Sequence, residues 1–146
     1  MKRCFFLLLM GLMACNATYH SSIPSLPVYL ELDLGFQDKD LVPLQAFKIY
    51  TKKNVTLAVE RTGYGGVLVY HALDNNYYAF DAACPHEANA SITVQIDESR
   101  LHAICPKCQS NYDLSYGNAN PVEGPSREAL KRYPLTLSGN KIYVRN

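Results

Sequence analysis

The sequence predicts a domain built almost entirely of antiparallel β-strands. Runs of four to seven residues that are rich in β-branched and aromatic side chains recur along the chain. Short clusters of Gly, Asn, Asp and Ser separate these runs, and such short links can join only antiparallel neighbours, because a parallel crossover needs about a dozen residues or more. Only 126–132 has helical potential, and Pro134 limits it to about one turn.

The amino-terminal segment is excluded from the fold, because it has the features of a secretion signal. Lys2 and Arg3 precede an apolar run that ends at Met13, and this run is much shorter than the ~20 residues of a membrane-spanning helix. Cys15 follows at the place where bacterial lipoprotein precursors carry the cysteine that receives lipid. We therefore predict a signal peptide over 1–14 and a lipid anchor at Cys15. An ordinary signal peptide with an incidental cysteine is the alternative.

The mature chain begins with a small, polar, proline-containing stretch over 15–27, which we interpret as a tether, and continues as a single domain over 28–146. Removal of residues 1–14 takes away two of the 14 basic residues and none of the 13 acidic ones, which leaves a net charge of −1. A nearly neutral chain without basic runs is not expected to bind nucleic acid. Asn16 in place of Asp after the lipidated cysteine favours the outer membrane, by analogy with enteric bacteria.

The domain is predicted to contain eight strands, and the turns between them determine how the strands are connected. The strands are 28–34, 55–59, 67–71, 77–80, 92–96, 101–104, 135–137 and 142–144. The glycine cluster at 63–66 predicts a hairpin turn rather than a phosphate-binding loop, because a strand and not a helix follows it. A hairpin of 92–96 with 101–104 would bring the loops at its two ends close together.

Those two loops carry four potential metal ligands, Cys84, His86, Cys105 and Cys108. Three cysteines remain in the mature domain, and an odd number beside a histidine indicates ligands rather than a disulfide framework. The Cys84 and His86 side chains would point the same way about 6.5 Å apart in an extended segment, which suits two adjacent irons. The Cys-x-x-Cys turn is common in zinc sites. The ligand pattern alone leaves zinc and iron–sulfur equally open.

The residues around the ligands resemble the Rieske family of 2Fe-2S proteins. The stretch CPKCQSNYD over 105–113 is similar to the second box of that family, Cys-Pro-x-His-Gly-Ser-x-Tyr/Phe-Asp, and 78–86 is similar to the first. The resemblance extends over about 55–144. It implies an all-β, antiparallel Rieske-like sandwich or barrel with a small cluster-binding subdomain built from two loops, and it implies electron transfer.

The family's residue roles carry over to matching positions. Cys84 and Cys105 would bind the inner iron and His86 the outer iron. Ser110 and Tyr112 would donate hydrogen bonds to a bridging sulfide and to a ligand sulfur, which stabilises the reduced cluster and raises its potential. Their alternative roles are a turn residue and a core ring. The loop that would cover the cluster is Gly124-Pro125.

Cys108 departs from the family, because it stands where the second histidine belongs. Two ferric ions, two sulfides and three thiolates carry one more negative charge than the two-histidine form. We therefore expect a potential below the range of about −150 to +300 mV of two-histidine centres and above about −400 mV. In quinol-oxidising members that histidine contacts the quinol, so quinol is not the expected partner. Asn89 replaces a loop cysteine, while Gln109 and Ala88 replace glycines.

These features predict a membrane-anchored one-electron carrier of the cell envelope, exposed to the periplasm, that exchanges electrons with a redox protein. The alternative is a structural or interaction module of the same fold that binds zinc or no metal. A Rieske oxygenase would need a further domain for mononuclear iron, for which the chain has no room. His71 and His102 could replace the missing ligand, but both lie in strand-like runs and are expected to be ordinary strand residues.

Overall fold

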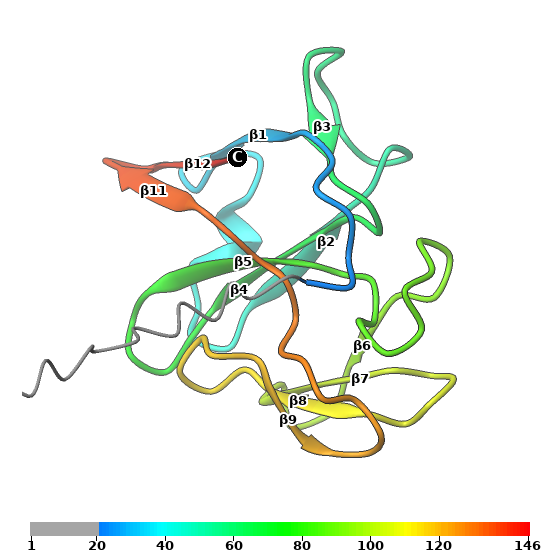
Figure 1. Cartoon of the computed structure of the whole chain (residues 1–146). Coiled ribbons are helices and arrows are strands. Elements are labelled where there is room, and N and C mark those ends of the chain that lie inside the picture. Colours follow the sequence, from blue (N-terminus) through cyan, green and yellow to red (C-terminus); the bar gives the residue numbers. More distant parts are fainter. Residues whose placement is uncertain (1–20) are drawn as a thin grey trace, which may run out of the picture.

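The structure is a computed structural model that describes residues 21–146, and every strand pair in this part of the chain is antiparallel (Figure 1). The strands are β1 (Val28–Asp33), β2 (Phe47–Tyr50), β3 (Arg61–Thr62), β4 (Val67–His71), β5 (Tyr77–Asp81), β6 (Gln95–Ile96), β7 (His102–Ile104), β8 (Asn111–Asp113), β9 (Asn120–Glu123), β10 (Arg132–Tyr133), β11 (Leu135–Ser138) and β12 (Lys141–Arg145). A 3₁₀-helix, η1, covers Lys39–Leu41. The predicted all-β, antiparallel fold is confirmed. The signal peptide and Cys15 lie outside the described residues.

The strands form three sheets of four strands in the described part of the chain. The base sheet has the order β11-β12-β1-β3, the middle sheet β10-β5-β4-β2, and the site sheet β6-β7-β8-β9. Figure 1 shows the base sheet and the site sheet on opposite sides of the middle sheet. The predicted hairpin of 92–96 with 101–104 is confirmed, since β6 pairs with β7. Turns at 74–76 and 138–140 likewise join β4 to β5 and β11 to β12.

The middle sheet is buried on both faces, which explains the continuous apolar run of β4. Side chains alternate across a strand, so Leu68 and Tyr70 enter the core shared with the site sheet, whereas Val67 and Val69 enter the core shared with the base sheet. All five residues of β4 are buried. This strand gives the site sheet a rigid support.

Two predicted elements are wrong. Residues 55–59 form no strand, because the Glu60 carboxylate accepts hydrogen bonds from the amides of Thr56 and Leu57, each at 2.8 Å, and holds this stretch in a turn. Residues 126–132 form no helical turn, since they are irregular up to the start of β10 at Arg132. The glycine cluster 63–66 also differs from the expected hairpin, because it connects β3 in the base sheet to β4 in the middle sheet.

Residues 21–27 lie against the domain, and we call this segment the strap. Ile23 is only 1% exposed. Ser22 donates two hydrogen bonds to Glu128, and Lys131 donates to the carbonyl oxygen of Ile23. The described part of the stretch interpreted as a tether therefore packs on the domain.

Candidate metal centre

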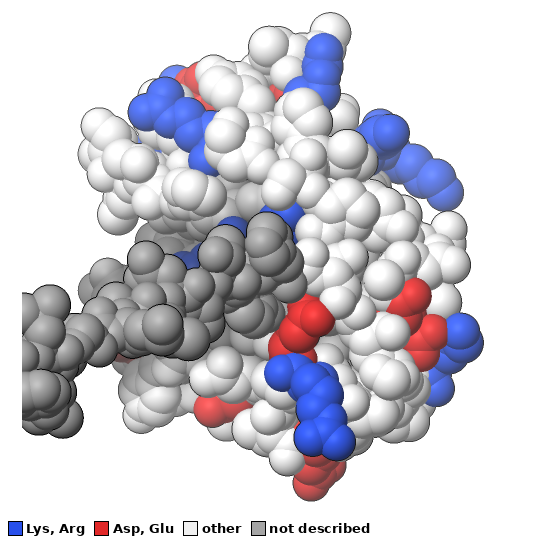
Figure 2. Space-filling model, viewed as in Figure 1, with Lys and Arg blue, Asp and Glu red and all other residues white. Residues whose placement is uncertain are grey.

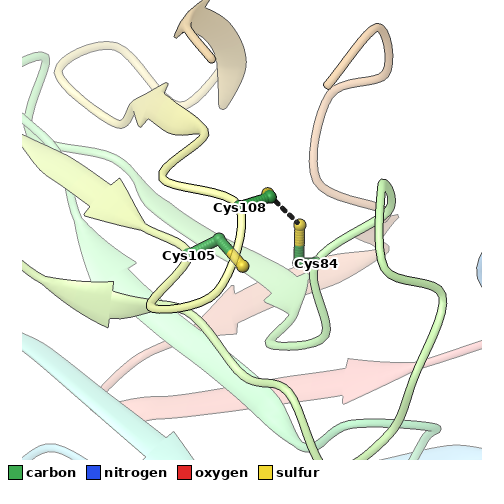
Figure 3. Close-up of side chains that lie close together, drawn as sticks. All are labelled: Cys84, Cys105 and Cys108. Carbon is green, nitrogen blue, oxygen red and sulfur yellow. Dashed lines mark hydrogen bonds between the residues drawn. The ribbon is translucent and has the colours of Figure 1, made fainter. Parts of the chain in front are cut away.

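Three of the four predicted ligands meet between the middle sheet and the site sheet (Figure 3). Cys84 lies in the loop that follows β5, while Cys105 and Cys108 lie in the turn between β7 and β8. The three Sγ atoms are within 4.8 Å of one another, and those of Cys84 and Cys108 are 3.6 Å apart. Cys84 and Cys105 are fully buried, whereas Cys108 is partly exposed. The predicted meeting of the two loops is thus observed.

The loop that carries Cys84 is positioned by Asp81, a fully buried carboxylate. Its Oδ1 accepts hydrogen bonds from the amides of Gly65 and Ala83, at 3.0 and 2.8 Å. Its Oδ2 accepts from the amide of Tyr64 at 3.0 Å and from the Tyr133 hydroxyl at 2.6 Å. Four donors satisfy the buried charge. They also fix the backbone immediately before Cys84.

The turn at 63–66 approaches the same backbone, and only glycine fits there. A Cβ on Gly65 would lie 2.5 Å from the Cβ of Ala83. The Tyr64 hydroxyl reaches further along the loop and donates to the carbonyl oxygen of Ala88 at 2.9 Å. Residues 63–66 therefore pack against the backbone of the Cys84 loop and hold it in place.

The Cys105 turn closes on itself through backbone hydrogen bonds. The Gln109 amide donates to the Cys105 carbonyl at 3.0 Å, and the Cys105 amide donates to the Ser110 carbonyl at 2.9 Å. Gln109 has φ +59° and Ala88 has φ +46°, both in the left-handed region. At these two positions the chain has other residues where the family that it resembles has glycine. Each keeps the backbone conformation that glycine adopts most easily, at a cost in strain.

Two hydroxyl groups lie against the cysteine sulfurs. The Tyr112 hydroxyl is 3.2 Å from the Sγ of Cys84, and the Ser110 Oγ is 3.1 Å from the Sγ of Cys108. The Ser126 amide donates to the same Ser110 Oγ at 2.9 Å. As a thiol, Cys108 donates to the Ser110 Oγ. Once Cys108 is a thiolate it can only accept, so the Ser110 hydroxyl must donate its proton to sulfur.

The predicted covering loop lies against Ser110. Gly124 has φ +87°, and a Cβ there would lie 2.5 Å from the Ser110 Cα. Pro125 follows and is exposed. This close approach explains the need for glycine.

The cysteines differ in acidity. Burial raises the pKa of the Cys105 thiol to about 11. Burial also acts on Cys108, but hydrogen bonds from the Ser110 hydroxyl and amide outweigh it and hold the pKa of Cys108 below its ordinary value. Burial and the contact with Cys84 raise the pKa of Tyr112, so its hydroxyl keeps its proton and can donate to sulfur.

The structure does not place His86 with the thiols. His86 lies two residues after Cys84 in the same loop, but it is exposed and lines a small cavity with Ser22 and Glu128. His71 stacks on Tyr77 with ring centroids 4.1 Å apart, and His102 contacts Asp97. Among residues 21–146, the three cysteines form the one group of donor atoms close enough for a metal.

The donor set fits a soft metal or an iron–sulfur cluster. Three thiolates favour zinc or iron–sulfur centres and disfavour magnesium and calcium, which take oxygen ligands. The two hydroxyls beside the sulfurs can stabilise negative charge on them. One further ligand is needed for a four-ligand set, and His86 is the nearest candidate along the chain.

The sequence interpretation missed Asp81, Tyr64 and Ser126. For Asp81 a signal exists, because a carboxylate at the end of a buried strand, followed by Ala82 and Ala83, needs several buried donors. For Tyr64 and Ser126 we find no local signal, since their partners are distant in the sequence.

Comparison with known proteins identifies the family of the chain. Residues 43–134, more than half of the chain, match the family described as Rieske [2Fe-2S] domain. No curated protein matches the chain. The structure is similar to a component of the complex of oxygenase and ferredoxin in carbazole 1,9a-dioxygenase, with a TM-score of 0.51 and 16% identity over 81% of this chain and 93% of that one.

Two further solved structures have lower TM-scores. The plasma membrane Rieske protein PetC3 from Synechocystis PCC 6803 has a TM-score of 0.47 and 21% identity over 66% of this chain and 82% of that one. The putative NADH-dependent nitrite reductase small subunit from Mycobacterium tuberculosis has a TM-score of 0.46 and 16% identity over 83% of this chain and 96% of that one.

Proposed function

Because this chain belongs to the Rieske [2Fe-2S] domain family, we propose that it is a one-electron carrier held at a membrane of the cell envelope by a lipid on Cys15. The observation that carries the proposal is the convergence of three thiols with two hydroxyl donors between the sheets. When bound, the 2Fe-2S cluster accepts and releases one electron. The residues of the chain determine the position of the cluster and its reduction potential.

Cys84, Cys105, Cys108 and His86 would hold the cluster. Tyr112 would donate to the Cys84 sulfur, and Ser110 to the Cys108 sulfur. Each such hydrogen bond favours the more negative, reduced state. Cys108 acts in the opposite direction, because a thiolate in place of a neutral imidazole adds a negative charge. The balance supports a potential below that of two-histidine centres.

Spectroscopy of anaerobically purified protein tests the ligand set. We expect about two irons and two acid-labile sulfides per chain, with nitrogen hyperfine couplings in the reduced state. His86→Ala should abolish these couplings, whereas His102→Ala should leave them unchanged. Couplings that persist in His86→Ala would remove His86 from the ligand set.

A structural zinc site is the second candidate. It is favoured by the three Sγ atoms, which lie within 4.8 Å of one another and so could share a single ion. The same preparation distinguishes the two, since one zinc per chain without colour would replace the electron-carrier proposal.

The membrane attachment is a separate part of the proposal. Residues 21–146 contain no helix that is long and apolar enough to span a membrane. We propose that attachment depends on lipid at Cys15, with the periplasm-facing leaflet of the outer membrane as the favoured location. A Cys15→Ala protein that still fractionates with membranes would contradict it.

The expected redox partner is a protein rather than quinol, because Cys108 occupies the position of the quinol-contacting histidine. Charged side chains of both signs are spread in small groups over the face seen in Figure 2. Mixed charges of this kind suit recognition by complementary pairs.

A further inference from the structure

The strap is bound at two points to the segment that leads from the covering loop to β10. The amide and hydroxyl of Ser22 donate to the two carboxylate oxygens of Glu128, at 2.9 and 2.5 Å. Lys131 Nζ donates to the Ile23 carbonyl at 3.0 Å and contacts the Ser25 hydroxyl at 2.8 Å. Between these polar contacts Ile23 is buried. The strap therefore restrains a segment more than 100 residues away in the sequence.

The restrained segment is connected to Cys108, a proposed cluster ligand, through hydrogen bonds. The Ser126 hydroxyl donates to the Glu128 carbonyl at 3.0 Å, and the Ser126 amide donates to the Ser110 Oγ at 2.9 Å. The Ser110 Oγ is in turn 3.1 Å from the Cys108 sulfur. An unbroken series of contacts thus connects Ser22 to Cys108 through Glu128, Ser126 and Ser110.

The Ser126 contact determines what Ser110 can do. A hydroxyl has one proton and two lone pairs. The Ser126 amide occupies one lone pair, and the Cys108 thiol donates to the other. As a cluster-bound thiolate, Cys108 can only accept, and the Ser110 proton then points at its sulfur. If the segment moved away, the hydroxyl could rotate toward water and its hydrogen bond to sulfur would weaken.

We propose that the strap is part of the cluster site, with Ser22 and Glu128 as positioning residues that keep the Ser110 hydroxyl directed at Cys108. The inference rests on the proposed function at one point, namely that Cys108 binds the cluster. Residues before the predicted domain boundary then influence cluster retention and potential.

Glu128→Ala is the central variant, and Glu31→Ala is its matched control. Glu31 forms an ion pair with Lys141 between β1 and β12, far from the site sheet, so its removal also costs one negative charge and one long-range contact. We expect Glu128→Ala to lose iron to a chelator about three- to tenfold faster than the wild type, the range given by the net contribution of one ordinary hydrogen bond. The potential should fall as well. Glu31→Ala should match the wild type in both.

Two further variants separate positioning from general destabilisation. Glu128→Gln keeps one acceptor oxygen and should partly restore slow iron release. Ser22→Ala combined with Glu128→Ala should behave like Glu128→Ala alone, because both changes break the same contact. Additive effects, wild-type iron release in Glu128→Ala, or equal acceleration in Glu31→Ala would each overturn the inference.

Hydrogen exchange of the metal-free chain gives a readout that needs no cluster. Amides of 124–128 should exchange faster in Glu128→Ala than in Glu31→Ala, and equal exchange would overturn the inference. Failure of the proposed function has a different signature, since wild-type protein would then contain no 2Fe-2S cluster while the exchange result still reports on the strap.

Discussion

The hydrogen bond between Tyr112 and Cys84 allows a quantitative prediction. Both side chains are fully buried, and the hydroxyl lies 3.2 Å from the sulfur. Tyr112→Phe removes this donor and leaves the ring in place. In a buried site, we estimate that the hydrogen bond favours the reduced cluster over the oxidised one by about 1 to 1.5 kcal/mol. For a one-electron couple this corresponds to a fall in potential of about 45 to 65 mV.

Redox titration followed by electron paramagnetic resonance measures this potential directly. Tyr133→Phe is the matched control, because Tyr133 is a buried tyrosine whose hydroxyl donates to Asp81 at 2.6 Å instead of to a sulfur. It should leave the potential unchanged and lower the free energy of unfolding by about 1.5 to 3 kcal/mol. An unchanged or higher potential in Tyr112→Phe, or an equal fall in Tyr133→Phe, would refute the reasoning.

Three further variants test other parts of the molecule. Asp81→Asn should lower the free energy of unfolding by about 2 to 4 kcal/mol, because an amide cannot accept from all four donors; urea unfolding that shows less than half of this loss would argue against the role of Asp81. Cys108→His should raise the potential by removing a negative charge, and a lower value in voltammetry would contradict the charge argument. Although burial opposes it, hydrogen bonds from Tyr50 and Lys48 hold the pKa of Asp38 below 3.8. Asp38 therefore stabilises the fold above that pH, and the stability is lost as the pH falls through its lowered pKa; in unfolding experiments on metal-free protein, Asp38→Asn should remove this part of the acid sensitivity, and an unchanged acid profile would disprove it.

The features that the sequence predicts well depend on neighbours in the chain. The run Val67–His71 is apolar without interruption, and the structure buries all of it between two sheets. The Cys84 loop precedes β6, the turn with Cys105 and Cys108 follows β7, and these two strands pair as a hairpin, so local pattern was enough to bring Cys84 near Cys105 and Cys108.

The features that the sequence did not predict depend on distant partners. The Asp81 carboxylate accepts hydrogen bonds from residues 16 and 52 positions away in the sequence. The Glu128 carboxylate accepts from a residue 106 positions away. Residues 55–59 have the composition of a strand, but the Glu60 side chain binds their amides and prevents pairing. The strand Phe47–Tyr50 was missed because Lys48 interrupts its apolar pattern.

The base sheet connects the beginning of the domain with its end. β1 pairs with β12 along its length, with Leu30 opposite Val144. Contacts between such distant residues close the largest possible loop, and folds that rely on them form slowly. Because a chain is synthesised from its amino end, this sheet cannot be completed until Arg145 has been made. Pairing of β1, the strand that follows the strap, is thus coupled to synthesis of the last strand, β12.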